Sequence, residues 1–161
     1  MPENDVAPAA LSGATVFIKP KRARPFFGRH PWVLDSAILR VDGNPDSGAV
    51  VDVVTHDGNF IARGLWNASS RIRVRLYSFT QDQALDQLFW NARIENAVAL
   101  RQQLHLFSKK TGCRLINSEG DNLSGVIVDQ YGPYLAVQVT ALVMAERLDM
   151  ICDSLERIVQ P

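Results

Sequence analysis

The chain has 161 residues, of which 47% are hydrophobic and 21% charged, and its formal net charge is zero. This composition predicts one ordinary globular domain or two small ones and excludes an intrinsically disordered chain. No apolar run reaches the roughly 18 residues that a membrane-spanning helix needs, and the start Met-Pro-Glu-Asn-Asp is acidic where a secretory signal is basic. We therefore expect a cytoplasmic protein without a membrane partner.

Positive charge is concentrated in the first half of the chain. Residues 14–80 contain ten Lys or Arg and five Asp, whereas residues 81–161 contain seven bases and ten acids. Two halves of opposite charge suggest two units with different partners. A basic surface favours a polyanion because each neutralised phosphate releases condensed counterions, but a solvated surface would produce the same excess.

Short strands separated by turns are predicted between residues 14 and 77. The preceding residues 1–13 are small and polar, and we expect a disordered leader there. Three prolines between residues 19 and 32 predict a loop with at most one helical turn, and Asp57-Gly58 predicts a hairpin. The predicted strands are 15–18, 33–41, 49–55, 59–65 and 71–76. This pattern is typical of a small β-barrel or sandwich.

The periodicity changes near residue 80, where a mixed helix and strand unit is predicted over 80–161. Thr80 and Gln83 form a capping-box pattern, which predicts a helix over 81–108, with Gly112 as its C-cap. Strands are predicted over 113–117, 125–130 and 134–140, and a second helix over 144–159. The predicted fold class is thus α+β. Because the last helix runs into Pro161 without a polar tail, we expect this second unit to be incomplete.

Basic and aromatic residues are interleaved in the segment 19–32. Basic groups bind phosphates and aromatic rings stack on unpaired bases, which predicts RNA binding. The alternative is that the aromatic residues are core and the bases merely solvated. We expect Trp32 and one of Phe26 and Phe27 in the core. The RNA-binding candidates of this segment are Lys19, Lys21, Arg22, Arg24, Arg29 and His30.

Arg71, Arg73 and Arg75 alternate with apolar residues and therefore share one face of a predicted strand. Side chains two residues apart lie roughly 7 Å apart, close to the phosphate spacing of a nucleic acid. The alternative is a solubilising strand face. We prefer RNA binding, since no acid interrupts the row.

Glu119 and Asp121 flank Gly120 in a predicted tight turn. Two neighbouring carboxylates are suited to acid–base chemistry or to a hard cation, but Asp and Gly are equally typical of turns, and we prefer the turn. The three histidines match no metal spacing, and Cys113 and Cys152 are expected to be reduced. No metal site and no catalytic residue is predicted.

Four segments in order resemble motifs of one enzyme family. They are Arg29-His30-Pro31-Trp32-Val33, the hairpin Asp57-Gly58 to Arg63-Gly64, the strand Ser70-Arg71-Ile72-Arg73-Val74-Arg75, and Glu119-Gly120-Asp121-Asn122-Leu123-Ser124-Gly125 followed by Asp129-Gln130-Tyr131. Together they resemble the methyltransferases that form 5-methylcytosine in 23S rRNA with S-adenosylmethionine (SAM). One departure is Ser124, where the family usually has proline.

The resemblance implies a PUA domain, a compact RNA-binding pseudo-barrel, over 14–77, and part of a linker domain over 80–161. It implies that the Rossmann-like catalytic domain, with its SAM site, is absent from this chain, which alone should be inactive. Arg63 in the hairpin motif joins the RNA-binding candidates. The signature turn comprises Glu119, Gly120, Asp121, Gly125 and Asp129. The alternatives are a stand-alone RNA-binding module and a module that binds an acidic protein.

Overall fold

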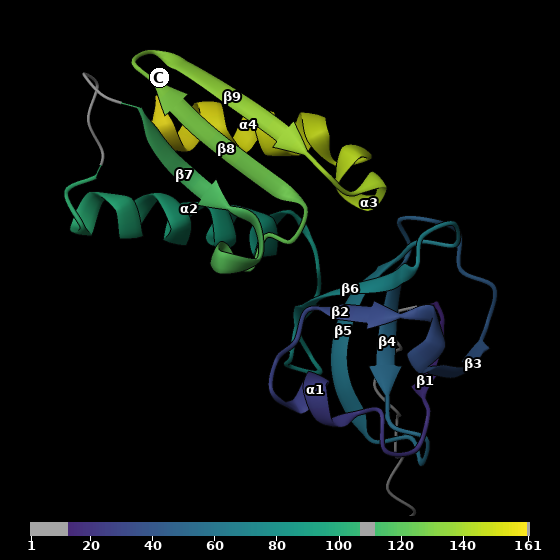
Figure 1. Ribbon diagram of the computed structural model, residues 1–161. Helices are drawn as coiled ribbons and strands as arrows, with labels where there is room; N and C mark the ends of the chain where they lie inside the picture. The colour runs from purple at the N-terminus through teal and green to yellow at the C-terminus, as the bar shows by residue number, and fades with distance from the viewer. Residues whose placement is uncertain (1–12, 107–111, 161) are drawn as a thin grey trace, which may run out of the picture.

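The computed structural model describes residues 13–106 and 112–160, so the predicted leader lies outside the described residues except for Gly13. Within these ranges the backbone forms a curled six-stranded sheet followed by a three-stranded sheet with helices (Figure 1). This arrangement confirms the predicted α+β class, in which a β half-barrel precedes a mixed unit.

The first sheet has the strand order β2-β6-β5-β4-β1-β3. Only β1 and β4 pair in parallel among these strands, and the remaining pairs are antiparallel. The strands are β1 (Thr15–Ile18), β2 (Trp32–Leu34), β3 (Ile38–Asp42), β4 (Val50–Val54), β5 (Phe60–Trp66) and β6 (Ile72–Ser78). Alternating valines and isoleucines, such as Val16, Ile18, Val51 and Val53, fill the interior and are almost completely buried.

The single strand predicted over 33–41 is wrong, because the turn η1 (Asp35–Ala37) divides it into β2 and β3. β2 pairs with β6, whereas β3 pairs with β1 at the opposite edge of the sheet. One chain segment therefore supplies both edges, and the turn lets the sheet curl. The backbone N–H of Asp35 donates to the carbonyl oxygen of Arg71 at 3.0 Å and fixes the turn against β6.

The second sheet, with strand order β7-β8-β9, is antiparallel and packs against two longer helices (Figure 1). Its elements are α2 (Gln87–Gln103), β7 (Cys113–Asn117), η2 (Ser118–Asp121), β8 (Val126–Tyr131), β9 (Tyr134–Val139), α3 (Leu142–Ala145) and α4 (Leu148–Val159). The three predicted strands are thus confirmed within a residue or so. None of the helices in the described ranges combines the length and hydropathy that crossing a membrane requires.

The first long helix starts later than predicted. Asp86, not Thr80, is its N-cap, and the Asp86 carboxylate accepts a hydrogen bond from the Phe89 N–H at 2.9 Å. The preceding linker is held in a non-helical conformation because the carbonyl oxygen of Gln83 accepts a hydrogen bond from Arg63. The helix ends at Gln103, so Gly112 is not its C-cap, and residues 107–108 of the prediction lie outside the described ranges.

The helix predicted over 144–159 is also divided, into α3 and α4. The guanidinium of Arg147 lies at the break and donates to the carbonyl oxygens of Val143 at 2.7 Å and Gly48 at 2.9 Å. It therefore satisfies one carbonyl of α3 and one of the half-barrel at once. This tertiary partner, 99 residues away, explains why the local periodicity did not predict the break.

The half-barrel shares an apolar contact with the second unit, which comprises β7–β9 and α2–α4 and which we call the helical lobe. Leu65 of β5 and Tyr77 of β6 are buried in the core of the helical lobe and not in that of the half-barrel. Tyr77 packs its ring edge against Trp90 of α2, with ring centroids 4.9 Å apart. The half-barrel and the helical lobe are therefore joined by packed side chains as well as by the linker between β6 and α2.

Candidate nucleic-acid interface

An open groove of about 590 Å³ lies beside the short helix α1 (Arg24–Phe27) of the half-barrel. The pairing of β2 with β6 brings Trp32 and Ile72 to its wall, next to the buried ring of Phe26. Arg22 and Arg71, 49 residues apart in sequence, both line the groove and are both exposed. The groove therefore combines an apolar surface with two cationic groups.

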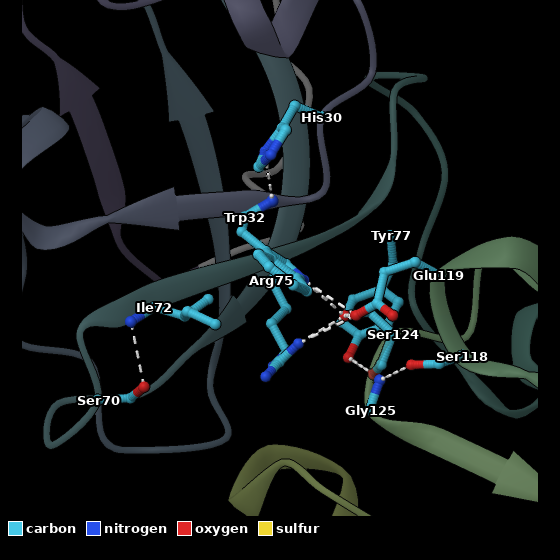
Figure 2. Close-up of polar contacts among 10 residues, drawn as sticks. All are labelled: His30, Trp32, Ser70, Ile72, Arg75, Tyr77, Ser118, Glu119, Ser124 and Gly125. Atoms are coloured by element: carbon cyan, nitrogen blue, oxygen red, sulfur yellow. Dashed lines mark hydrogen bonds and ion pairs between the residues drawn. The ribbon is translucent and has the colours of Figure 1, made fainter.

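His30 and Trp32 pack against each other at the groove (Figure 2). Nδ1 of His30 accepts a hydrogen bond from the Trp32 backbone N–H at 3.2 Å, so the remaining ring nitrogen, Nε2, carries the proton of the neutral imidazole. Phe26 is in the core as expected, but the prediction that Trp32 is core is wrong, since 36% of Trp32 is exposed. Trp32 lies on an edge strand, where its ring faces the groove and the second lobe.

The other bases of this segment lie around a second pocket of about 420 Å³. Lys19, Lys21 and Arg24 line it together with the exposed ring of Phe27. Nζ of Lys19 donates to the carbonyl oxygen of Ser36 at 2.9 Å. Arg29 follows α1 and is exposed. The fold thus distributes the predicted basic cluster over neighbouring sites.

Arg63 is not part of the exposed basic surface. Its side chain is only 2% exposed and forms two hydrogen bonds with the Asp52 carboxylate, at 2.7 and 3.1 Å. Its third contact is the carbonyl oxygen of Gln83, at 2.7 Å. A guanidinium with these partners is committed to the fold, so we leave Arg63 out of the RNA-binding set.

Two members of the arginine row on β6 are also engaged within the protein. Arg73 donates to the carbonyl oxygens of Asn67 and Ala68 and lies over the Trp66 ring. Arg75 is largely buried and contacts the second lobe. Only Arg71 of the three is exposed. Arg73 lies against the turn at Asn67 and Ala68, and Arg75 lies against the signature turn.

The signature turn joins the two lobes through Glu119 (Figure 2). Oε1 of Glu119 accepts hydrogen bonds from the Trp32 indole N–H at 3.0 Å, from the Ser124 hydroxyl at 2.7 Å and from Arg75 at 3.3 Å. Arg75 also donates to the Ser124 hydroxyl at 2.7 Å, and the buried Tyr77 hydroxyl donates to the Ser124 carbonyl oxygen at 2.7 Å. We call these five residues the interlobe cluster.

The environment of Glu119 favours its charged form. Burial opposes ionisation, but hydrogen bonds from Ser124, Ser118, the Glu119 backbone and Trp32 outweigh it and lower the pKa of the carboxyl below its ordinary value. Glu119 is therefore an ionised acceptor that holds two lobes together. Trp32, Arg75 and Glu119 come from three of the four motifs, and these three residues hold the two lobes together.

The remaining carboxylates of the signature are also paired. Asp121 is buried, forms an ion pair with Arg101 of α2 and accepts from the Asn117 N–H at 2.6 Å. Asp129 pairs with Arg114 at 2.9 and 3.0 Å, and the hydrogen bonds from Arg114 lower the pKa of Asp129. These pairings favour the turn over acid–base chemistry. Among the described residues no three His, Cys, Asp or Glu converge on a metal position.

The two glycines of the signature turn differ in backbone conformation, because only Gly125 has a positive φ. Gly120 lies in η2 without a positive φ, and a Cβ there would meet the Asn117 side chain at 3.2 Å. The left-handed positions are Ser118, at φ 48°, Asn122, at φ 57°, and Gly125, at φ 91°. A Cβ on Gly125 would lie 2.6 Å from that of Ala141, so only glycine fits.

The half-barrel belongs to a known class of domain by similarity, because residues 16–79 match the PUA-like domain family. Over most of its length the chain is homologous to part of proteins named ribosomal RNA large subunit methyltransferase I. It is 39% identical over 122 residues to the protein of Shewanella amazonensis, 42% over 123 residues to that of Shewanella denitrificans, and 33% over 145 residues to that of Aeromonas hydrophila.

These matches cover 76% to 90% of this chain but only 31% to 36% of the relatives, so the chain spans about a third of their length. Two solved structures share the fold. A Streptococcus mutans protein described as a candidate SAM-dependent methyltransferase has a TM-score of 0.74 at 15% identity, over 91% of this chain and 38% of its own. A candidate methyltransferase solved with SAH has a TM-score of 0.71 at 17% identity, over 91% and 37%.

Proposed function

We propose that this chain is the RNA-docking region of a SAM-dependent methyltransferase that forms 5-methylcytosine in 23S rRNA. Its half-barrel holds the rRNA substrate, and the catalytic domain is carried by residues outside this chain. The proposal is supported by the PUA-like domain and by the names of the homologous proteins. The observation that carries it is the groove in which Arg22 and Arg71 flank the exposed Trp32.

The chemistry of the groove suits single-stranded RNA. Bases stack on aromatic rings largely independently of sequence, and guanidinium groups bind phosphates with two parallel hydrogen bonds. The Trp32 ring offers a stacking surface, and Arg22 and Arg71 lie on the same groove without an ion pair among the described residues. Lys19, Lys21, Arg24, Arg29 and His30 extend the basic surface around α1.

We propose further that the SAM site is not among the described residues. Rossmann-type cofactor sites lie at the carboxyl ends of parallel strands that alternate with helices. Among the described residues the parallel pairing is that of β1 with β4, and the sheet beside the long helices is antiparallel. We therefore assign no methyl-transfer step to these residues and expect the chain alone not to methylate rRNA.

The groove is tested by binding a fluorescently labelled single-stranded RNA to the Arg22→Gln, Arg71→Gln double variant. Removal of two charged donors should weaken binding about a hundredfold, since each charge-assisted hydrogen bond contributes about 1.5 kcal/mol and about 1.4 kcal/mol corresponds to a factor of ten. The slope of log K against log salt should become shallower by about 0.7 for each phosphate that the variant no longer neutralises. Arg157→Gln, on the exposed face of α4, removes the same charge elsewhere and should change neither quantity.

Equal RNA affinity in the double variant and in Arg157→Gln would contradict the groove as the RNA site. Affinity that does not change with salt would contradict RNA docking altogether. Formation of 5-methylcytosine by this chain with SAM would contradict the assignment of catalysis to another domain.

A further inference from the structure

A small polar pocket of about 170 Å³ lies where the half-barrel, the linker and the helical lobe meet. Arg29 reaches it from the segment after α1, and Arg93 from α2. Ser78 lines it from the end of β6, Thr80 from the linker, and Asn122 from the end of the signature turn. The pocket is therefore assembled from segments that are far apart in the sequence, and it is separate from the groove beside α1.

The pocket is positively charged without a neutralising group. Arg29 and Arg93 both line it, no acid does, and neither guanidinium has an ion pair within residues 13–106 and 112–160. Arg93 is half-buried and donates to the carbonyl oxygen of Tyr77 at 3.2 Å. Burial and the nearby charge of Arg29 lower the pKa of Arg93, which shows that this charge is held at a cost.

Beside the rings of Phe79 and Phe89, the pocket is lined by neutral hydrogen-bonding groups. The Ser78 hydroxyl donates to the carbonyl oxygen of Thr80 at 3.3 Å, the Thr80 side chain adds a second hydroxyl, and the side-chain amide of Asn122 has no hydrogen-bond partner among the described residues. Guanidinium, hydroxyl and amide donors around an enclosed space without an acid are the donor set that binds a tetrahedral oxyanion. If these arginines served only as a solvated surface, the exposed position of Arg29 would be explained. The half-buried position of Arg93 without an ion pair would not be explained.

We infer that this pocket binds a backbone phosphate of the RNA that occupies the groove, an inference that rests on the proposed function. The pocket and the groove are neighbours along the chain, because Arg29 lines the pocket and the next residue, His30, lines the groove. Since the two arginines come from different lobes, the phosphate contacts both the PUA-like domain and the helical lobe.

The test uses the full chain and three variants: Arg29→Gln, Arg93→Gln and Arg157→Gln. Each of the first two should weaken binding of the single-stranded RNA by about tenfold and make the salt slope shallower by about 0.7, whereas Arg157→Gln should not. Arg29 is exposed, so its variant keeps the test valid if Arg93→Gln lowers stability. NMR of the arginine Nε–H groups, recorded with RNA and separately with inorganic phosphate, identifies which ligand reaches Arg93.

Wild-type RNA affinity in Arg29→Gln and Arg93→Gln, together with weakened binding in the Arg22→Gln, Arg71→Gln variant, would overturn this inference and leave the proposed function standing. Absence of RNA binding by the unmodified chain would overturn both. Saturation of the Arg93 signal by submillimolar inorganic phosphate, with no change on adding RNA, would assign the pocket to a free anion and overturn the RNA phosphate.

Discussion

Glu119 shows how much one side chain contributes to the position of two lobes. Its hydrogen-bond donors Trp32, Arg75 and Ser124 lie 87, 44 and 5 residues away in the sequence. Two of these contacts cross between the lobes, and the hydroxyl of Ser124 links them. The serine that departs from the family's proline therefore has a function, because proline has no hydroxyl that could donate to Glu119.

We expect Glu119→Gln to lower the free energy of unfolding by about 1 kcal/mol near neutral pH, after allowance for solvent screening at a partly exposed site. The folded pKa of Glu119 is lowered, so its contribution is complete above the ordinary value of 4.5 and is lost as the pH falls through the folded pKa. Thermal unfolding of both proteins from pH 7 to pH 3 measures this difference.

Glu95→Gln, on the exposed face of α2, should unfold like the wild type over the same pH range. A difference between wild type and Glu119→Gln that grows as the pH falls below 4.5 would show that the carboxylate is not the stabilising form.

The arginine row shows what a sequence can predict about single residues. Alternation placed Arg71, Arg73 and Arg75 on the face opposite to Val74, which is buried. It could not predict that Arg73 and Arg75 are engaged within the protein, because their partners come from a turn and from a distant lobe. For the same reason Arg93, on a helix without any motif, was not a candidate, although it shares a pocket with Arg29.

At the scale of elements, β5 is the most enclosed strand of the half-barrel. Five consecutive residues, from Ile61 to Leu65, are buried. Gly64 allows β6 to approach closely, since a Cβ there would lie 2.2 Å from the Arg75 carbonyl oxygen. Arg63, in the middle of this strand, holds both β4, through Asp52, and the linker, through Gln83.

Arg63→Ala should therefore destabilise the protein by about 3 kcal/mol, since it leaves Asp52 unpaired in a largely buried position and releases the linker. Chemical denaturation with urea measures the decrease in stability. Arg114→Ala removes an equally bidentate but exposed ion pair with Asp129 and should destabilise the protein much less than Arg63→Ala does.

The double variant Arg63→Met, Asp52→Leu should recover part of this stability, because it removes both charges at once. If Arg63→Ala costs no more than Arg114→Ala, the Arg63 pair does not anchor the linker.

Helix boundaries show where local patterns fail at this scale. The strands of the second sheet follow their alternation, and the prediction placed them well. The sequence pattern predicted neither the start of α2 nor the division between α3 and α4. Before α2, Arg63 of β5 binds the carbonyl oxygen of Gln83, and between α3 and α4, Arg147 binds that of Gly48. A capping-box pattern at Thr80 carries no information about such tertiary contacts.

At the scale of the whole molecule, the two lobes are bound by apolar as well as polar contacts. Leu65 and Tyr77 of the half-barrel are buried in the core of the helical lobe, and Tyr77 is also part of the interlobe cluster. The sequence predicted the order of the motifs and the change of periodicity between the two units. It did not predict this shared core, because a buried leucine on a strand has the same pattern whichever core it enters.

We expect thermal unfolding to be one cooperative transition, because separating the lobes would expose Leu65 and Tyr77. Differential scanning calorimetry should give a calorimetric enthalpy equal to the van't Hoff enthalpy, and circular dichroism and fluorescence should give the same midpoint. Two resolved heat-capacity peaks would show that the lobes unfold independently.

The position of Trp32 gives the protein an intrinsic optical probe. Trp90 is buried in the second core, and Trp66 lies beneath Arg73, but the indole of Trp32 forms part of the groove wall and donates its N–H to Glu119. Light emitted by this ring depends on what stacks against it and on whether that carboxylate stays in place. The proposed RNA binding and a separation of the lobes should therefore both change the emission of Trp32 in the unlabelled protein.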